Sequence, residues 1–146
     1  MTTATKQTVE TLAQEYCEKI TEANEAWLKK LRLNDDGTFA PWHLDEAGNY
    51  KTDDNPQYFT YIIGRKYLKV VSMEWEDEAK YQKINAAPAG YQPNNVHAFV
   101  DKKTGDVFLP ASWNAPAKGA RFNLFENKEA LFEGVMRRPH GGYLYR

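Results

Sequence analysis

The residues best suited to chemistry lie in one irregular stretch, VFLPASWNAPAKGARFN at 107–123. Its prolines and alanines fit neither the helical nor the strand period, so we expect a loop. Lysine and arginine bind phosphate, an aromatic ring stacks on a base, and an amide hydrogen-bonds to polar edges. The residues of this stretch that could bind a phosphate-bearing ligand, a nucleotide or a nucleic acid, are Trp113, Lys118, Arg121, Phe122 and Asn123.

Two further candidates lie upstream, Arg65 beside a turn and His97 within a predicted strand. Strand alternation places the His97 side chain opposite those of Val96 and Ala98, where a single histidine is more often structural than catalytic. Other cations lie near predicted turns and would join the site if the turns meet at one end of a sheet: Lys66, Lys69, Lys102 and Lys103. In the alternative interpretation, the stretch is a rigid loop that closes the core with Trp113 as its plug.

Recognisable enzyme motifs are absent from the sequence. It contains no phosphate-binding glycine loop, dinucleotide-binding motif or zinc-protease motif, and one cysteine with three scattered histidines does not suit a zinc site. Cys17 lies among glutamates, which raise the pKa of a thiol, so it is a poor nucleophile. Neither Ser72 nor Ser112 lies in a nucleophile turn. We therefore expect a protein that binds a ligand without turning it over and uses no cofactor or metal.

Charge is distributed unevenly along the 146 residues. The net charge of −1 combines −5 for residues 1–60, 0 for 61–101 and +4 for 102–146. A total so close to zero argues against a protein that coats nucleic acid non-specifically, because such binding neutralises many phosphates. The positive final third leaves room for one local anion site.

The rest of the composition is typical of a folded protein of the cytoplasm. The mean hydropathy is −0.73 and the aromatic share is 14%, which indicate a polar surface around a substantial core. The single cysteine rules out an intramolecular disulfide and fits a reducing compartment. No apolar run approaches the roughly 18 residues that span a bilayer, and no signal peptide is visible. No internal repeat is apparent.

Apolar residues recur every three or four positions over 8–32, which predicts a long amphipathic helix. The members of this stripe are Val9, Leu12, Tyr16, Ile20, Ala23, Trp27 and Leu31. The stripe could pack on the protein's own sheet or against the helix of a second copy, which would form a homodimer. A polar connector follows at 34–57, with Trp42 and Tyr50 as expected anchors.

The remaining chain predicts a small sheet and a short helix. β-branched and aromatic residues predict strands at 58–63, 67–75, 96–101 and 106–109, with turns at Gly64 and Gly105. The segment 76–95 is expected to be a solvated connection, 127–136 a short helix, and 143–145 an extended, docked tail. The fold class is therefore α+β. The long N-terminal helix packs on an antiparallel sheet of four or five strands, in one domain over 1–146.

The segment VHAFVDKKTGDVFLPASWNAPAKGARFNL at 96–124 resembles a family of small, mostly uncharacterised proteins of tailed bacteriophages, cyanophages among them. That family has a strand bearing histidine, a KTGD hairpin, an ASWKAPAK segment and an ARxN ending. GRKYLKVV at 64–71 and GGYLY at 141–145 resemble its flanking segments. The resemblance implies a viral source and an accessory role in host take-over or defence evasion, in the host cytoplasm.

The chain departs from that family at two positions. Leu109 and Asn114 stand where the family usually has cations. These losses weaken a nucleic-acid site and retain a smaller anion pocket based on Lys118 and Arg121. The sequence therefore predicts a non-enzymatic protein that binds a phosphate-bearing ligand. The alternative is a protein-interaction module that inhibits or redirects a host protein.

Overall fold

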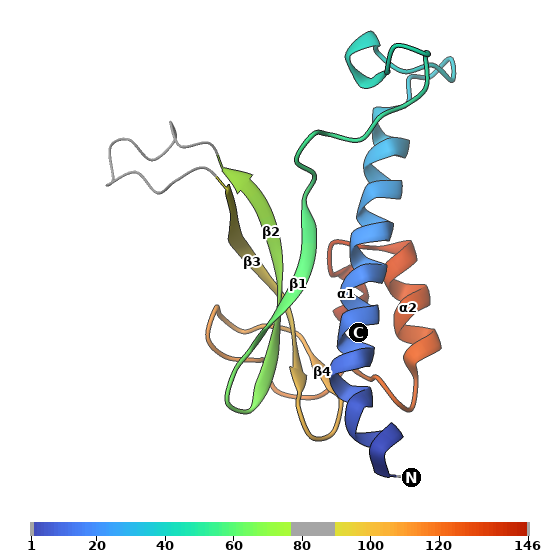
Figure 1. Cartoon of the computed structure of the whole chain (residues 1–146). Helices are drawn as coiled ribbons and strands as arrows, with labels where there is room; N and C mark the ends of the chain where they lie inside the picture. The colour runs from blue at the N-terminus through green and yellow to red at the C-terminus, as the bar shows by residue number, and fades with distance from the viewer. Residues whose placement is uncertain (1, 77–89, 146) are drawn as a thin grey trace.

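The computed structural model of the chain describes residues 2–76 and 90–145. It shows one long helix, α1 (Thr2–Arg32), along one face of a five-stranded antiparallel sheet, with the shorter α2 (Lys128–Arg137) packed against α1 (Figure 1). The predicted α+β class, with an N-terminal helix on an antiparallel sheet, is confirmed.

The predicted apolar stripe of α1 is the side that meets the sheet. Val9, Tyr16, Ile20 and Ala23 are all buried. The helix ends at Arg32 as predicted, with Lys29, Lys30 and Arg32 in the last turn, where cations favour the helix dipole. The helix continues past the sheet, so Leu31, which belongs to the same stripe, is 64% exposed. Homodimer formation through this helix stays a prediction.

The five strands follow one another in sequence order across the sheet. They are β1 (Tyr58–Ile63), β2 (Tyr67–Glu76), β3 (Gly90–Asp101), β4 (Asp106–Phe108) and β5 (Phe122–Asn123). Gly105 between β3 and β4 has a φ of +79°, which glycine adopts without a steric penalty. The predicted strands are all present, and β5 adds a short fifth one.

β3 begins at Gly90, which corrects the sequence prediction of a connection as far as residue 95. Glycine, proline and asparagine lower the strand propensity of 90–95, but the ladder to β2 holds this segment, as in the pairs Trp75↔Tyr91 and Met73↔Pro93. The Tyr91 hydroxyl also donates to the Pro56 carbonyl at 2.8 Å. The rest of the predicted connection, 77–89, lies outside the described residues.

The β2–β3 ladder contains two irregularities close together. Val70 pairs with Ala98 but Val71 pairs with Val96, so His97 is an extra residue on β3. Such a bulge breaks the alternation of side chains. His97 therefore points toward α1, on the same side as Ala98, and the predicted opposite orientation is wrong.

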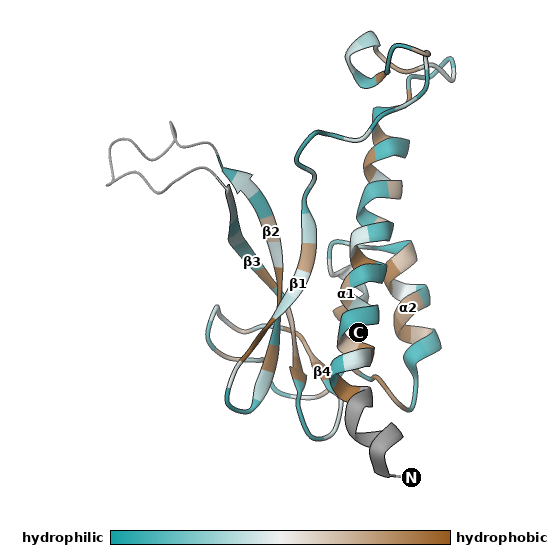
Figure 2. Cartoon of the chain, viewed as in Figure 1, coloured by the Kyte–Doolittle hydropathy of each residue, from teal (hydrophilic) through white to brown (hydrophobic). Residues whose placement is uncertain are grey.

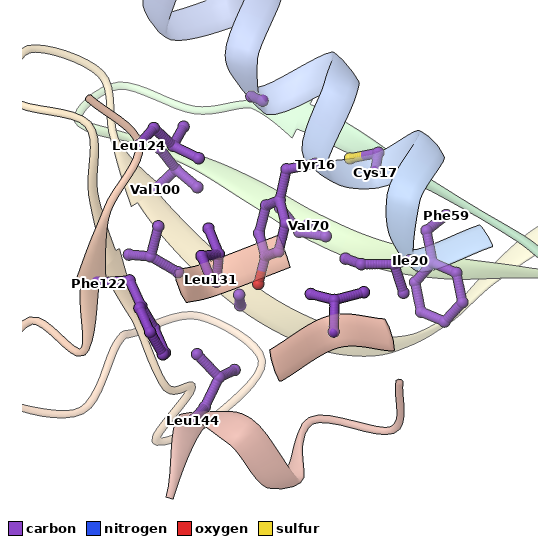
Figure 3. Packing of buried hydrophobic residues seen from close by; sticks show 14 of the residues in the cluster. Tyr16, Cys17, Ile20, Phe59, Val70, Val100, Phe122, Leu124, Leu131 and Leu144 are labelled. Atoms are coloured by element: carbon purple, nitrogen blue, oxygen red, sulfur yellow. The ribbon is translucent and has the colours of Figure 1, made fainter. Parts of the chain in front are cut away.

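The core lies between the sheet and the two helices. Figure 2 shows hydrophobic residues gathered where α1, α2 and the strands face one another. Tyr16 and Ile20 of α1, Val70 and Val100 of the sheet, and Leu131 of α2 meet there with almost no exposed surface (Figure 3).

The C-terminal tail, residues 141–145, packs against this core through Tyr143 and Leu144. It forms a single 3₁₀ turn, η3 (Gly142–Leu144), so the predicted extended conformation is wrong. Tyr143 and Leu144 are nonetheless buried, so the tail is docked. A Cβ at Gly134 of α2 would lie 2.8 Å from the Tyr143 Cβ, which means that only glycine lets the tail approach α2 this closely.

The connector forms two similar hairpin turns beyond the end of α1 (Figure 1). LNDDGTF at 33–39 and LDEAGNY at 44–50 each end in a bridge from leucine to an aromatic residue, and each contains a glycine with a φ of +85°. This short repeat was missed in the sequence. Between the two lies η1 (Pro41–His43), whose Trp42 is 74% exposed, so Trp42 is not an anchor. Tyr50 does anchor the connector, because its hydroxyl accepts a hydrogen bond from Arg32 at 3.0 Å.

Candidate functional site

The stretch that carries most predicted site residues extends the β4–β5 hairpin. Backbone hydrogen bonds from Ala117 to Leu109 and from Arg121 to Val107 continue the pairing on both arms, and Pro110 forms a bridge with Pro116. Beyond this bridge, the backbone N–H groups of Ala111 and Ser112 donate to the Ala115 carbonyl, and residues 111–115 form an exposed tip. Figure 1 shows this loop, in orange, on the side of the sheet away from α1.

Trp113 at the tip lies against the outer face of the sheet. Its ring is 41% exposed, and the Lys69 ammonium lies 4.4 Å from the ring centroid, a cation–π contact. Trp113 therefore does not fill the core, and the interpretation of the stretch as a plug built on this residue is wrong.

A row of side chains crosses the outer face beneath Trp113. The pairs Ile62↔Lys69, Lys69↔Phe99 and Phe99↔Phe108 place these four residues on the same face. The ring of Tyr67 makes edge contacts with Phe99 and Phe108, each with a centroid distance of 5.9 Å. Regular alternation thus produces an aromatic surface that carries a lysine at its centre.

A pocket of about 240 Å³ opens beside this row. Residues of β1, β2, β3 and the loop line it: Ile62, Gly64, Arg65, Tyr67, Lys69, Phe99 and Asn114. We call the surface around it the cation–aromatic face, defined as Arg65, Lys66, Tyr67, Lys69, Phe108 and Trp113. It combines cations with partly exposed rings, the two components of a site for phosphate and a base.

The predicted gathering of the turns is present at this end of the sheet. The Lys102 ammonium donates to the carbonyls of Gly64 and Arg65 at 2.8 and 3.3 Å. The β3–β4 turn, with its lysines, therefore lies beside Arg65 and Lys66 of the β1–β2 turn. The basic residues of the two turns add to the positive charge at this end of the sheet, and the negative charge of Asp101 partly offsets it.

Asp101 stays ionised within this basic end. Partial burial by itself would raise its pKa. Hydrogen bonds from the backbone N–H groups of Thr104 and Lys103, together with the charge of Lys66, outweigh that effect and lower the pKa below its usual value. Asp101 therefore orders the turn that presents Lys102 and Lys103.

Three predicted site residues of the stretch are wholly or partly taken up by contacts within the protein. The Phe122 ring is enclosed in the core, with 7% exposure, so it has no face on which a base could stack. The Asn123 amide donates to the Thr104 carbonyl and to Asp106, and its oxygen accepts from the backbone N–H groups of Phe125 and Glu126. Arg121 is half-buried at the entry to β5.

The structure thus brings together a different set from the predicted one. Trp113 contacts Lys69, and Lys69 and Arg65 line one pocket, whereas Lys118 is exposed on the returning arm of the loop. Lys69 and Tyr67 are the main site residues that were not selected as leading candidates from the sequence. The pairing of Lys69 with Phe99 in the β2–β3 ladder is what could have identified them. His97 lies on the opposite side of the sheet, hydrogen-bonded to Tyr143, because of its bulge.

Fold and site together define a small α+β protein whose five-stranded sheet has one face covered by helices and the other bearing cations and aromatic rings. No helix in the described part of the chain is long and apolar enough to cross a membrane. In the same residues, no cluster of three or more histidine, cysteine or acidic side chains could hold a metal ion. The chain belongs to a family of unknown function, DUF7717, whose family model matches residues 1–146. No curated protein and no solved structure matches it.

Proposed function

We propose that the protein binds a ligand carrying both phosphate and a base, a nucleotide or a short single-stranded nucleic acid, on the cation–aromatic face. The observation that carries this proposal is the position of the Lys69 ammonium, 4.4 Å from the Trp113 ring centroid beside an open pocket. A base stacks on the exposed part of Trp113, and its phosphate lies between Lys69 and Arg65. Base stacking on an aromatic ring contributes about 1–3 kcal/mol.

The charge of the whole protein favours a small ligand. A net charge of −1 gives little long-range attraction for a polyanion. The binding site offers a few cations at one end of the sheet, enough for one or two phosphates. A nucleotide or the end of a strand therefore suits it better than a duplex. The resemblance of the loop and its flanking strands to phage proteins favours a setting in host take-over or defence evasion.

Fluorescence anisotropy tests this proposal directly. Short labelled DNA and RNA oligonucleotides are titrated at low salt, with unlabelled nucleotides as competitors. Trp113→Ala and Lys69→Ala should each weaken binding about fivefold or more, because a base loses its stacking partner or a phosphate loses its cation. Trp42→Ala and Lys30→Ala are matched controls, since both residues are exposed and lie on or beyond α1.

The result that contradicts the proposal is equally clear. The proposal is contradicted if neither probe binds at low salt, or if the two site variants bind as tightly as Trp42→Ala does. Because Trp113 is exposed at a loop tip, its replacement should leave the melting temperature nearly unchanged. Loss of binding with the fold intact therefore reports on the site itself.

A second candidate function, a protein-interaction module, is favoured by the connector hairpins. Trp42 is 74% exposed and Leu33 is 43% exposed, beyond the end of α1. Aromatic side chains this exposed are frequent anchors of interfaces. The hairpins also carry acidic residues, namely Asp35, Asp36, Asp45 and Glu46. Their partner would present a basic surface with an apolar pocket. Loss of a host partner in Trp42→Ala but not in Trp113→Ala would assign the function to the connector.

A further inference from the structure

A second pocket, of about 280 Å³, lies on the α1 side of the sheet, where His97 is. Strands β1–β3, the start of the loop and the C-terminal segment enclose it. Its lining residues are Gln57, Phe59, Ser72, Asn95, Val96, His97, Leu109, Pro110, His140, Gly141, Leu144 and Tyr145. No aspartate, glutamate, lysine or arginine is among these lining residues, in contrast to the cation–aromatic face.

The two irregularities of the β2–β3 ladder build the polar wall of this pocket. Ser72 lies at the second irregularity, where its hydroxyl accepts from the Asn95 N–H at 3.1 Å. The Ser72 side chain thus replaces the missing ladder partner of this backbone group. The first irregularity turns His97 inward, beside Phe59, with a ring centroid distance of 5.3 Å. The two irregularities therefore place the polar side chains of Ser72 and His97 in the wall of the pocket.

His97 ends a chain of three side chains linked by short hydrogen bonds. The hydroxyls of Tyr16 and Tyr143 are 2.6 Å apart, and the Tyr143 hydroxyl is 2.6 Å from Nε2 of His97. Tyr16 is fully buried, and within the described part of the chain its hydroxyl has no other hydrogen-bond partner. The Tyr16 proton must therefore be donated to the Tyr143 oxygen, because a buried donor without an acceptor costs about 1–3 kcal/mol.

This order of donation determines where the His97 proton resides. Tyr143 accepts from Tyr16 and donates its own proton to Nε2, so the proton of the neutral ring is on Nδ1. The reverse order would leave one tyrosine proton buried without an acceptor. Nδ1 has no hydrogen-bond partner among the described residues, and His97 lines the pocket, so Nδ1 is the ring nitrogen that remains for a ligand.

All three groups are uncharged near neutral pH. Burial, with a smaller contribution from His140, lowers the pKa of His97 to about 4. Burial also raises the pKa of Tyr143 and of Tyr16 well above their usual values. The chain therefore presents a fixed N–H donor without a charge, which binds a neutral carbonyl oxygen more readily than it binds an anion.

We propose that this pocket is a second binding site, for a small, uncharged, planar ligand with amide-like edges, such as a free pyrimidine base, whose carbonyl oxygen accepts a hydrogen bond from Nδ1 of His97. The amide of Gln57 and the hydroxyl of Ser72 line the same space. Each already donates one hydrogen bond and accepts one within the protein, so the second N–H of Gln57 and the remaining lone pairs are what they can offer the ligand's other polar edge. Phe59 and Leu144 supply apolar contacts for its ring faces. This site is independent of the cation–aromatic face and of the ligand proposed there.

The first test measures the tautomer. Two-bond ¹⁵N–¹H correlation spectra of the full chain labelled at histidine nitrogens distinguish Nδ1–H from Nε2–H in a neutral ring. We expect His97 to be Nδ1–H at neutral pH. Tyr143→Phe keeps the ring but removes the donor to Nε2, so the Nε2–H form should become populated. Tyr16→Phe is the matched control: Tyr143 still donates to Nε2, and the tautomer should not change. An Nε2–H ring in the unmodified protein overturns the proposal.

The second test measures binding with uracil, and with orotate as its carboxylated, anionic counterpart. Uracil should shift the His97 Nδ1 signal in a saturable titration, while orotate should bind at least about tenfold more weakly because the described residues that line the pocket include no lysine or arginine. Tyr143→Phe should weaken uracil binding several-fold, within the range of one hydrogen bond, and Tyr16→Phe by less than twofold. Equal affinity for the two probes, or no binding of uracil, overturns the proposal. Should Tyr143→Phe not fold, the tautomer and titrations of the unmodified protein still decide it.

Discussion

The two faces of the sheet differ in what covers them, although the same strands form both. On the inner face, Leu68, Val70 and Val100 are completely buried under α1 and α2. On the outer face, Lys69 and Tyr67 alternate with these residues and remain partly exposed. The inner face contains most of the hydrophobic core. The outer face buries Phe99 but leaves other rings and cations partly exposed, and these exposed groups are the basis of the binding proposal.

The inner face itself is not uniform. Where β2 and β3 pair regularly it is apolar, and where the bulges interrupt them it becomes a polar pocket with a hydrogen-bonded histidine. A bulge thus places a polar group on a face that strand alternation reserves for the core. The comparison teaches that register, more than residue type, decides whether a side chain of this sheet serves packing or binding.

The largest expected effect compares neighbours on one strand. Leu68→Ala removes a fully buried side chain from the core, and the free energy of unfolding should fall by about 2–5 kcal/mol. Lys69→Ala removes a side chain of the opposite face whose main contact is with Trp113, and should cost about 1 kcal/mol or less. Chemical denaturation measures both. Similar losses for the two variants would mean that the outer face also belongs to the core.

The next effect, of intermediate size, concerns the polar part of the inner face. His97 has a pKa of about 4 in the folded protein, against 6.5 for an unperturbed histidine, because of burial and then His140. The unfolded chain therefore binds the proton more tightly. The stability that this difference provides is fully present above pH 6.5 and is lost as the pH falls toward 4. The loss should approach about 3 kcal/mol.

Urea denaturation at several pH values measures this loss by difference. The unmodified protein should lose more stability between pH 6.5 and 4 than His97→Gln, which keeps an acceptor for Tyr143 but does not titrate. His43→Gln is the control, since His43 lies in the connector away from the core. Parallel curves for the unmodified protein and His97→Gln would show that His97 is not held neutral by its surroundings. The polar part of the inner face would then not differ from an exposed surface in its response to pH.

Much of the fold follows from local pattern, whereas the site depends on pairing between distant segments. The 3.6-residue period of α1 and the β-branched runs of β1 and β2 were enough to predict the class and most element boundaries. The orientation of His97 could not be predicted, because the bulge exists only in the ladder with β2. Asn123 and Phe122 resembled binding residues because their types suit phosphate sites. Tertiary contacts commit the first to a turn and the second to the core.

The smallest expected effect decides which cations of the outer face contact phosphate. Each phosphate contact adds about 0.7 to the slope of log K against log salt for a single strand. Lys69 lies under Trp113, so Lys69→Ala should reduce the slope for a short oligonucleotide by about one contact. Lys118 lies on the returning arm of the loop, and Lys118→Ala should change the slope by less. The measurement is an anisotropy titration across several salt concentrations. If the larger change belongs to Lys118, the ligand lies along the loop predicted from the sequence. If it belongs to Lys69, the ligand lies on the strands, and the sheet register rather than the loop selects the residues that bind it.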